Sequence, residues 1–164
     1  MFKLQKIVFL SALLSFGCLV SAWASTATEL FETGVELWYG KKPKEAISYF
    51  DQAIAKDPKF TRAYLCRAGA YESLNDNNAA FQDYDKAVKI APHYANGYEL
   101  RGYLHYRLGH FKAAEGDLNQ AHKWFKKVKD DDSAKRVAYT QGLIVKRLAT
   151  AKAKAQYQKQ NPSK

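Results

Sequence analysis

The chain has 164 residues but only two cysteines, Cys18 and Cys66. Cys18 lies in an apolar segment near the N-terminus, so Cys66 is the only cysteine in the rest of the chain. A single thiol cannot form an internal disulfide, and the fold therefore has to rest on packing. Cys66 lies within a helical pattern, where we expect a small buried apolar residue rather than a reactive thiol.

Motifs for catalysis and metal binding are missing too. No two of the four histidines have the i, i+4 spacing of a helical metal site, and we expect His105 to be packed or half-buried. The sequence has neither a glycine-rich phosphate loop nor a nucleophile elbow. Three aspartates at 130–132 lack the pattern of a calcium loop and suit a helix cap better. We therefore expect no enzyme, no metal and no cofactor.

Long hydrophobic runs are absent as well. An uncharged, mostly apolar run covers residues 7–20, whereas a membrane-spanning helix needs about 20 residues. Two lysines precede this run and the segment SAWA follows it, which is the layout of a secretory signal peptide. We predict a signal peptide at residues 1–24, cleaved after Ala24, and an exported protein, periplasmic or secreted. The alternatives are a membrane anchor at residues 7–20 and lipid attachment at Cys18, because SFGC resembles a bacterial lipoprotein box.

Acidic residues are scarce only toward the C-terminus. Residues 25–122 contain 12 lysines and arginines and 13 aspartates and glutamates, so this part is nearly neutral. Residues 123–164 contain 12 lysines and arginines but only three aspartates. The net charge of +10 therefore comes mainly from a basic C-terminal element attached to a neutral body.

A pattern that recurs every 34 residues dominates the rest of the sequence. The stretches AISYFDQAIAKDP (46–58) and AAFQDYDKAVKIAP (79–92) share Ala, three residues, an aromatic, two residues, Ala, four residues and Pro. The same shift brings a third, weaker copy into register, with Leu118 at the aromatic position and Lys126 at the proline position. The residues that align across the three copies are Gly34, Ala68 and Gly102; Ala46, Ala80 and Ala114; and Ala53, Ala87 and Ala121.

Each copy is predicted to form two helices. The breaks fall at YGKKPK, NDNN and LGH, and an apolar stripe at helical spacing follows the first break. Small residues would let paired helices approach closely, and the aromatic residues would fill the space between copies. The pattern resembles the tetratricopeptide repeat, a helix-turn-helix unit with the signature W-x2-L-G-x2-Y, A-x3-F and a closing P. The resemblance implies an all-α, right-handed solenoid with repeats at 27–60, 61–94 and 95–128, the last divergent.

The residues after the third repeat are predicted to form a basic capping helix at 129–158, followed by a disordered tail at 159–164. A terminal repeat needs its open apolar face covered. The aspartates at 130–132 suit the N-terminus of such a helix. Its packed face would carry Val137, Ile144, Leu148, Ala151 and Ala155.

The resemblance also implies binding of a partner's peptide or helix in a concave groove lined by the first helix of each repeat. Aromatic side chains give such a groove large contact area at low entropic cost. The alternative is that these residues only pack inside the protein. The predicted groove residues are Phe31, Val35, Trp38, Tyr39, Arg62, Leu65, Gly69, Glu72, Asn96, Glu99, Tyr103, Tyr106 and Arg107.

Family members that bind chaperone tails clamp a terminal carboxylate with Lys, Asn and Arg. The corresponding positions here carry other residues, so the resemblance implies that this clamp is absent. These positions are Phe31, Val35, Gly69, Asn96 and Leu100. We expect a protein partner of another class, in a role supporting assembly of an envelope complex. The alternative partner is a second copy of the chain, in a homo-oligomer that extends the short groove.

The basic helix has two interpretations. It is either a solvated cap or a surface that binds anionic membrane or an acidic protein. Nucleic acid is an unlikely partner, because few aromatic residues accompany the cations. The predicted basic surface consists of Lys135, Arg136, Lys146, Arg147, Lys152 and Lys154.

Overall fold

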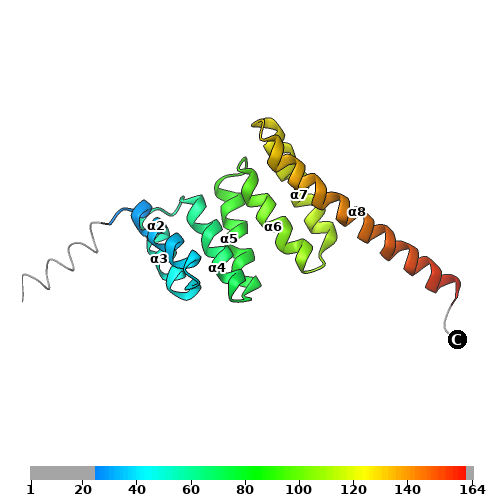
Figure 1. Cartoon of the computed structure of the whole chain (residues 1–164), viewed down its shortest axis with the longest axis horizontal. Helices are drawn as coiled ribbons and strands as arrows, with labels where there is room; N and C mark the ends of the chain where they lie inside the picture. The colour runs from blue at the N-terminus through cyan, green and yellow to red at the C-terminus, as the bar shows by residue number, and fades with distance from the viewer. Residues whose placement is uncertain (1–24, 162–164) are drawn as a thin grey trace, which may run out of the picture. The chain divides into compact units, whose positions relative to one another are not determined.

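The computed structural model describes residues 25–161, whose helices are shown in Figure 1. The predicted signal peptide and residues 162–164 lie outside the described residues. The described part contains helices and turns but no strand, and it divides into unit 1, up to Phe60, and unit 2, from Thr61. The helices of unit 1 are α2 (Ala27–Tyr39) and α3 (Pro43–Lys56). Those of unit 2 are α4 (Thr61–Ser73), α5 (Asn77–Ile90), α6 (Ala95–Arg107), α7 (Phe111–Lys127) and α8 (Asp131–Gln160).

The helices pack in the pairs that the repeat predicts. α2 packs against α3 in unit 1, while α4 packs against α5 and α6 against α7 in unit 2. The prediction of an all-α fold built from helix-turn-helix repeats is therefore confirmed.

The turn inside each pair depends on one residue in the left-handed region. Lys41 has φ 60°, Asn75 has φ 61° and Gly109 has φ 80°. These three positions are 34 residues apart, as in the sequence pattern. The left-handed conformation ends one helix and redirects the chain into the next. Only the third turn has glycine, the residue that adopts this conformation most easily.

Unit 1 shows why a small residue is needed in the first helix of a pair. Gly34 of α2 faces the ring of Phe50 of α3, and a Cβ at Gly34 would lie 2.6 Å from the Cε1 atom of that ring. Phe50 is fully buried, and its ring packs 5.9 Å from that of Phe31. A capping box starts α2: Thr26 accepts from the backbone N–H of Glu29, whose carboxylate accepts from that of Thr26.

Unit 2 repeats this packing and ends in α8. Asp130 caps α8 by accepting a hydrogen bond from the backbone N–H of Ser133, as the aspartate run predicted. Val137 and Ile144 are fully buried in a cluster with residues of α7, and Leu148 packs at its edge.

The second half of α8 differs from the prediction. Ala151 and Ala155, expected on the packed face, are exposed, as are all residues from 149 to 160. The reason is length: the 30 residues of α8 span about 45 Å, whereas the 17 residues of α7 span about 25 Å. The helix also continues to Gln160, beyond the predicted end at residue 158. No helix within residues 25–161 combines the length and apolar character needed to cross a bilayer.

Candidate functional site

A hollow in unit 2 is formed where α4 and α6 lie beside each other. It has a volume of about 170 Å³. Leu65 and Leu100 contribute apolar side chains to its lining, and Asn96 and Arg62 contribute polar groups. The complete lining is Arg62, Leu65, Cys66, Tyr94, Asn96 and Leu100. Three predicted groove residues, Arg62, Leu65 and Asn96, are thus brought together by the fold.

Sequence reasoning did not assign Cys66 and Tyr94 to this surface. Cys66 is only partly buried and lines the hollow instead of lying fully in the core. Burial raises the pKa of its thiol to about 11, and the Arg62 cation offsets only part of this effect. The thiol is therefore protonated at neutral pH, and a thiol in that form is a poor nucleophile. Tyr94 lies in the connection before α6, where the helix pattern gave no signal.

Glu72 and Arg107, also predicted for the groove, are bound to each other. A nitrogen of Arg107 lies 2.6 Å from a carboxylate oxygen of Glu72, and Asn77 accepts a second hydrogen bond from the same guanidinium at 3.2 Å. The hydroxyl of Tyr84 donates to the other oxygen of Glu72. Burial, and then this hydrogen bond, raise the pKa of Tyr84. The cluster joins α4, α5 and α6, so these charges hold the helices at one end of the unit.

Glu99 and Tyr103 are covered by the first half of α8. Arg136 donates two hydrogen bonds to Glu99, at 2.8 and 3.1 Å, and the Glu99 side chain is only 5% exposed. Burial raises the pKa of Tyr103, which lies beside Glu99 and Thr140. Arg136 was predicted as part of the basic surface, but here it neutralises a buried carboxylate.

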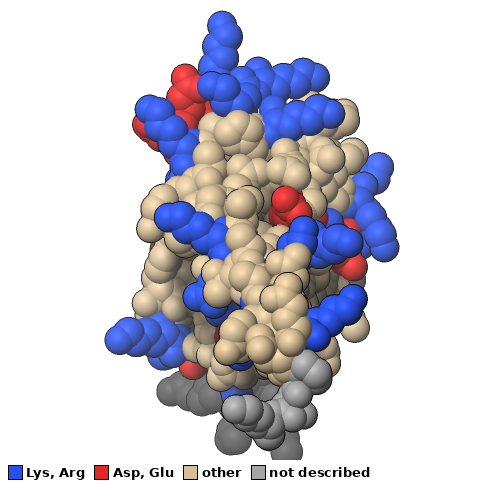
Figure 2. Space-filling view, turned by 90° about the vertical axis from the view of Figure 1, so that its right-hand side faces the viewer, with Lys and Arg blue, Asp and Glu red and all other residues tan. Residues whose placement is uncertain are grey.

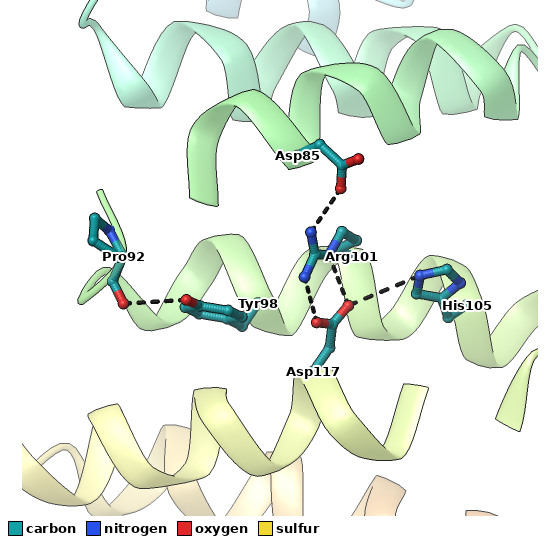
Figure 3. A network of polar contacts seen from close by, with 6 residues as sticks. All are labelled: Asp85, Pro92, Tyr98, Arg101, His105 and Asp117. Carbon is teal, nitrogen blue, oxygen red and sulfur yellow. Dashed lines mark hydrogen bonds and ion pairs between the residues drawn. The ribbon is translucent and has the colours of Figure 1, made fainter. Parts of the chain in front are cut away.

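A second arginine connects three helices of unit 2 (Figure 3). Arg101 of α6 donates to both oxygens of Asp117 on α7, at 2.8 and 2.6 Å, and to Asp85 on α5 at 2.6 Å. These hydrogen bonds raise the pKa of the Arg101 guanidinium. The same bidentate contact joins Arg67 to Asp83, each 34 residues earlier, at 2.7 and 2.6 Å. The Arg–Asp pair is therefore part of the repeat and positions the walls of the hollow.

The predicted groove residues of the first repeat lie in unit 1. Phe31 is only 3% exposed and packs against Phe60 with ring centres 5.0 Å apart, so it does not lie on an open surface. Val35 is partly buried, Trp38 stacks on Tyr39 at 6.0 Å, and Tyr39 is 80% exposed.

The predicted basic residues all lie on α8, and one of them, Arg147, contacts the predicted groove residue Tyr106. The guanidinium of Arg147 lies 5.7 Å from the ring centre of Tyr106 and 5.9 Å from that of Phe111. Lys135 pairs weakly with Asp132, and Lys146, Lys152 and Lys154 are exposed. Lysine and arginine side chains predominate among the charged groups on the face shown in Figure 2.

The histidines serve packing and connections within unit 2. His122 hydrogen-bonds the carbonyl of Ala134 at 3.2 Å and so links α7 to α8. His105 packs against Phe81, lies 3.4 Å from His110 between the Nδ1 atoms, and has its pKa lowered by burial. No group of three or more potential metal ligands occurs within the described residues.

Comparison with known proteins shows what this geometry is similar to. The tetratricopeptide repeat model matches residues 31–95. A curated relative, Protein STIP1 homolog of Dictyostelium discoideum, is 34% identical over 92 residues, which cover 56% of this chain. The chain spans only 16% of that relative's length.

Two solved structures share the fold. The first TPR of Spaghetti (RPAP3) bound to the HSP90 peptide SRMEEVD has a TM-score of 0.67 at 23% identity, covering 76% of this chain and 94% of that one. PcrH in complex with the chaperone binding region of PopD has a TM-score of 0.69 at 18% identity, covering 73% and 91%. The 34-residue period and the paired helices agree with these similarities: residues 31–95 match the tetratricopeptide repeat, and the chain shares the fold of these solved structures.

Proposed function

We propose that the protein is a non-catalytic interaction module whose unit 2 hollow receives an anchor side chain from a partner's peptide or helix. The observation that carries this proposal is the hollow itself, whose lining combines two leucines, an aromatic ring and two polar side chains. At about 170 Å³ it is smaller than the roughly 300–1,000 Å³ typical of small-molecule sites, so one side chain suits it better than a cofactor. The similar structures of Spaghetti and PcrH hold peptide or protein partners.

The partner is proposed to differ from the HSP90 peptide bound by Spaghetti. Asn96 and Leu100, at two of the positions where a carboxylate clamp would stand, line the hollow, and its one cation is Arg62. An apolar side chain would bury its surface against Leu65 and Leu100, while the Asn96 amide would form hydrogen bonds with a partner backbone or side chain. Recognition would then depend on an internal segment of the partner rather than on its C-terminus.

Photo-crosslinking tests this proposal. A benzoylphenylalanine at Leu100 should crosslink a specific protein, whereas the same group at the exposed Lys86 of α5 should not. The peptide SRMEEVD should neither bind nor compete. Equal crosslinking from both positions, with the helical content intact, would reject the hollow as the binding site, and competition by SRMEEVD would reject the proposed partner class.

We also propose that this binding takes place outside the cytoplasm and supports assembly of an envelope complex. The support is the sequence pattern of residues 1–24, with its positive start, apolar run and small-residue end. The mass of the protein recovered from cells tests it: a chain beginning at Ser25 is expected. An intact apolar run at 7–20 would indicate an anchor instead, and a lipid on Cys18 would indicate a lipoprotein.

A further inference from the structure

The surface of unit 2 also has a basic depression, separate from the hollow. It lies between the start of α7 and the projecting half of α8 and has a volume of about 360 Å³. We call it the basic cradle, and its lining is Phe111, Lys146, Arg147, Thr150, Ala151 and Lys154. We propose that the basic cradle and the adjoining face of α8 dock an acidic α-helix of a partner protein.

The proposal that the partner is a helix follows from a line of side chains at helical spacing along α8, whose first members pack inside the unit. Val137 and Ile144 on this line are covered by α7. Leu148 continues this line and packs at the edge of the cluster, whereas Ala151 and Ala155, three and seven residues further on, are exposed. Alanines let a second helix backbone approach closely. A partner helix here would extend the packing that α7 makes with the first half of α8.

The charges specify an acidic helix. Lys146, Arg147 and Lys154 line the cradle, and no aspartate or glutamate follows Asp132 in the sequence. Arg147 is held in place by its contacts with two aromatic rings, so less side-chain freedom is lost when it binds a carboxylate. Lys152 adds a cation on the other side of the alanine line, so that glutamates on both flanks of a docked helix would meet positive charge.

A lipid surface fits these features less well. The exposed part of the apolar line consists mainly of alanine, whose methyl groups bury little area on insertion into a bilayer. The small apolar area of these alanines therefore favours a protein partner over anionic lipid.

Binding to a designed probe tests the proposal on the full chain. The probe is a labelled, alanine-rich helical peptide with the heptad repeat AAALEAE, which places glutamates on both flanks of an apolar line, and its control replaces each glutamate with glutamine. Fluorescence anisotropy should show binding of the acidic peptide only. Lys146→Glu with Lys154→Glu should weaken it by about tenfold or more, because attraction becomes repulsion at two contacts. The matched control, Lys86→Glu with Lys89→Glu, makes the same charge change on exposed α5 positions and should have an effect of about twofold or less.

Other outcomes would overturn the proposal. Equal loss in both double variants would mean that net charge alone attracts the peptide. Absence of peptide binding, or binding only to phosphatidylglycerol vesicles, would also reject it. Ala151→Leu distinguishes docking of the peptide from insertion into vesicles. The leucine would fill the cradle and should weaken peptide binding, whereas its added apolar area would strengthen insertion into vesicles. Crosslinking from Leu100 should be unaffected by these variants, because the hollow and the cradle share no lining residue, so the two proposals can fail independently.

Discussion

Arg136→Met tests whether one ion pair holds the capping helix in place. Arg136 on α8 donates two hydrogen bonds to Glu99 on α6, and methionine keeps much of the apolar stem while removing both donors. Glu99 would then remain as a buried carboxylate without its cation. We expect a clear loss of stability, because a buried charge loses its compensation.

The magnitude follows from how much of the pair is exposed. Removing one partner of a fully buried ion pair costs about 3–5 kcal/mol. The Glu99 side chain is 5% exposed, but that of Arg136 is 55% exposed, so solvent already screens one member. We therefore expect a loss of about 2 kcal/mol in the free energy of unfolding. For a chain of this size, that corresponds to a fall of about 4–8 °C in Tm.

Thermal and urea unfolding, followed by circular dichroism, measure this change. Combining Arg136→Met with Glu99→Gln should restore stability to within about 1 kcal/mol of the Glu99→Gln single variant, since no buried charge remains. Lys135→Met is the matched control, and we expect a change of less than about 0.5 kcal/mol because its pair with Asp132 is exposed. The reasoning is refuted if Arg136→Met is equally costly with Glu99 and with glutamine at that position.

Three further predictions concern other contacts. Arg101→Met should cost about 3 kcal/mol in urea unfolding, because it leaves two carboxylates without their shared cation; a loss below about 1 kcal/mol would contradict this. With Cys18 replaced by serine, alkylation of Cys66 should be slow at pH 8 and should accelerate as the pH approaches 11, and rapid labelling at pH 8 would show that burial does not raise its pKa. Gly34→Ala should lower stability by about 1 kcal/mol, because the clash with Phe50 exceeds the gain in helix propensity. Gly142→Ala, with open space around it, should raise stability by about 0.5–1 kcal/mol, and a gain at both glycines would refute the clash.

The repeat period was enough to predict the helix pairs. Each copy carries its own small residue, aromatic residue and turn signal, so the contacts within a pair lie close in sequence. The turn signals NDNN and LGH predicted the breaks between paired helices, and they contain Asn75 and Gly109, which both have positive φ. Local chemistry likewise predicted the Asp130 cap, which needs only the residues that follow it.

The partners of individual charges did not follow from the period. Glu99 and Arg136 were assigned to different surfaces, although they bind each other across 37 positions. The register of α8 against α6 is set by packing that occurs once in the chain, and no repeated pattern records it. By contrast, Arg67 and Asp83 are 16 residues apart, as are Arg101 and Asp117. This repeated Arg–Asp spacing was visible in the sequence and indicates pairing.

The exposed alanines show another limit of periodicity. A stripe at helical spacing defines a face, but it does not say how much of that face meets a partner inside the chain. Ala151 and Ala155 continue the stripe of Ile144 and Leu148, yet α7 is too short to reach them. The length of the neighbouring helix decides which part of the stripe is buried.

The composition of α8 gives a physical reason for its projecting half. Ala, Lys and Gln, which dominate residues 149–160, are strong helix formers, so this segment can stay helical without packing. A cap needs only the part of α8 that covers α7, where the buried side chains end at Ile144 and Leu148 packs at the edge. The remaining turns add no core, but they carry cations on a stiff support attached to the last repeat. That division leaves two separate surfaces on a single folded unit: the hollow between α4 and α6, with one cation in its lining, and the cradle on α8, with three.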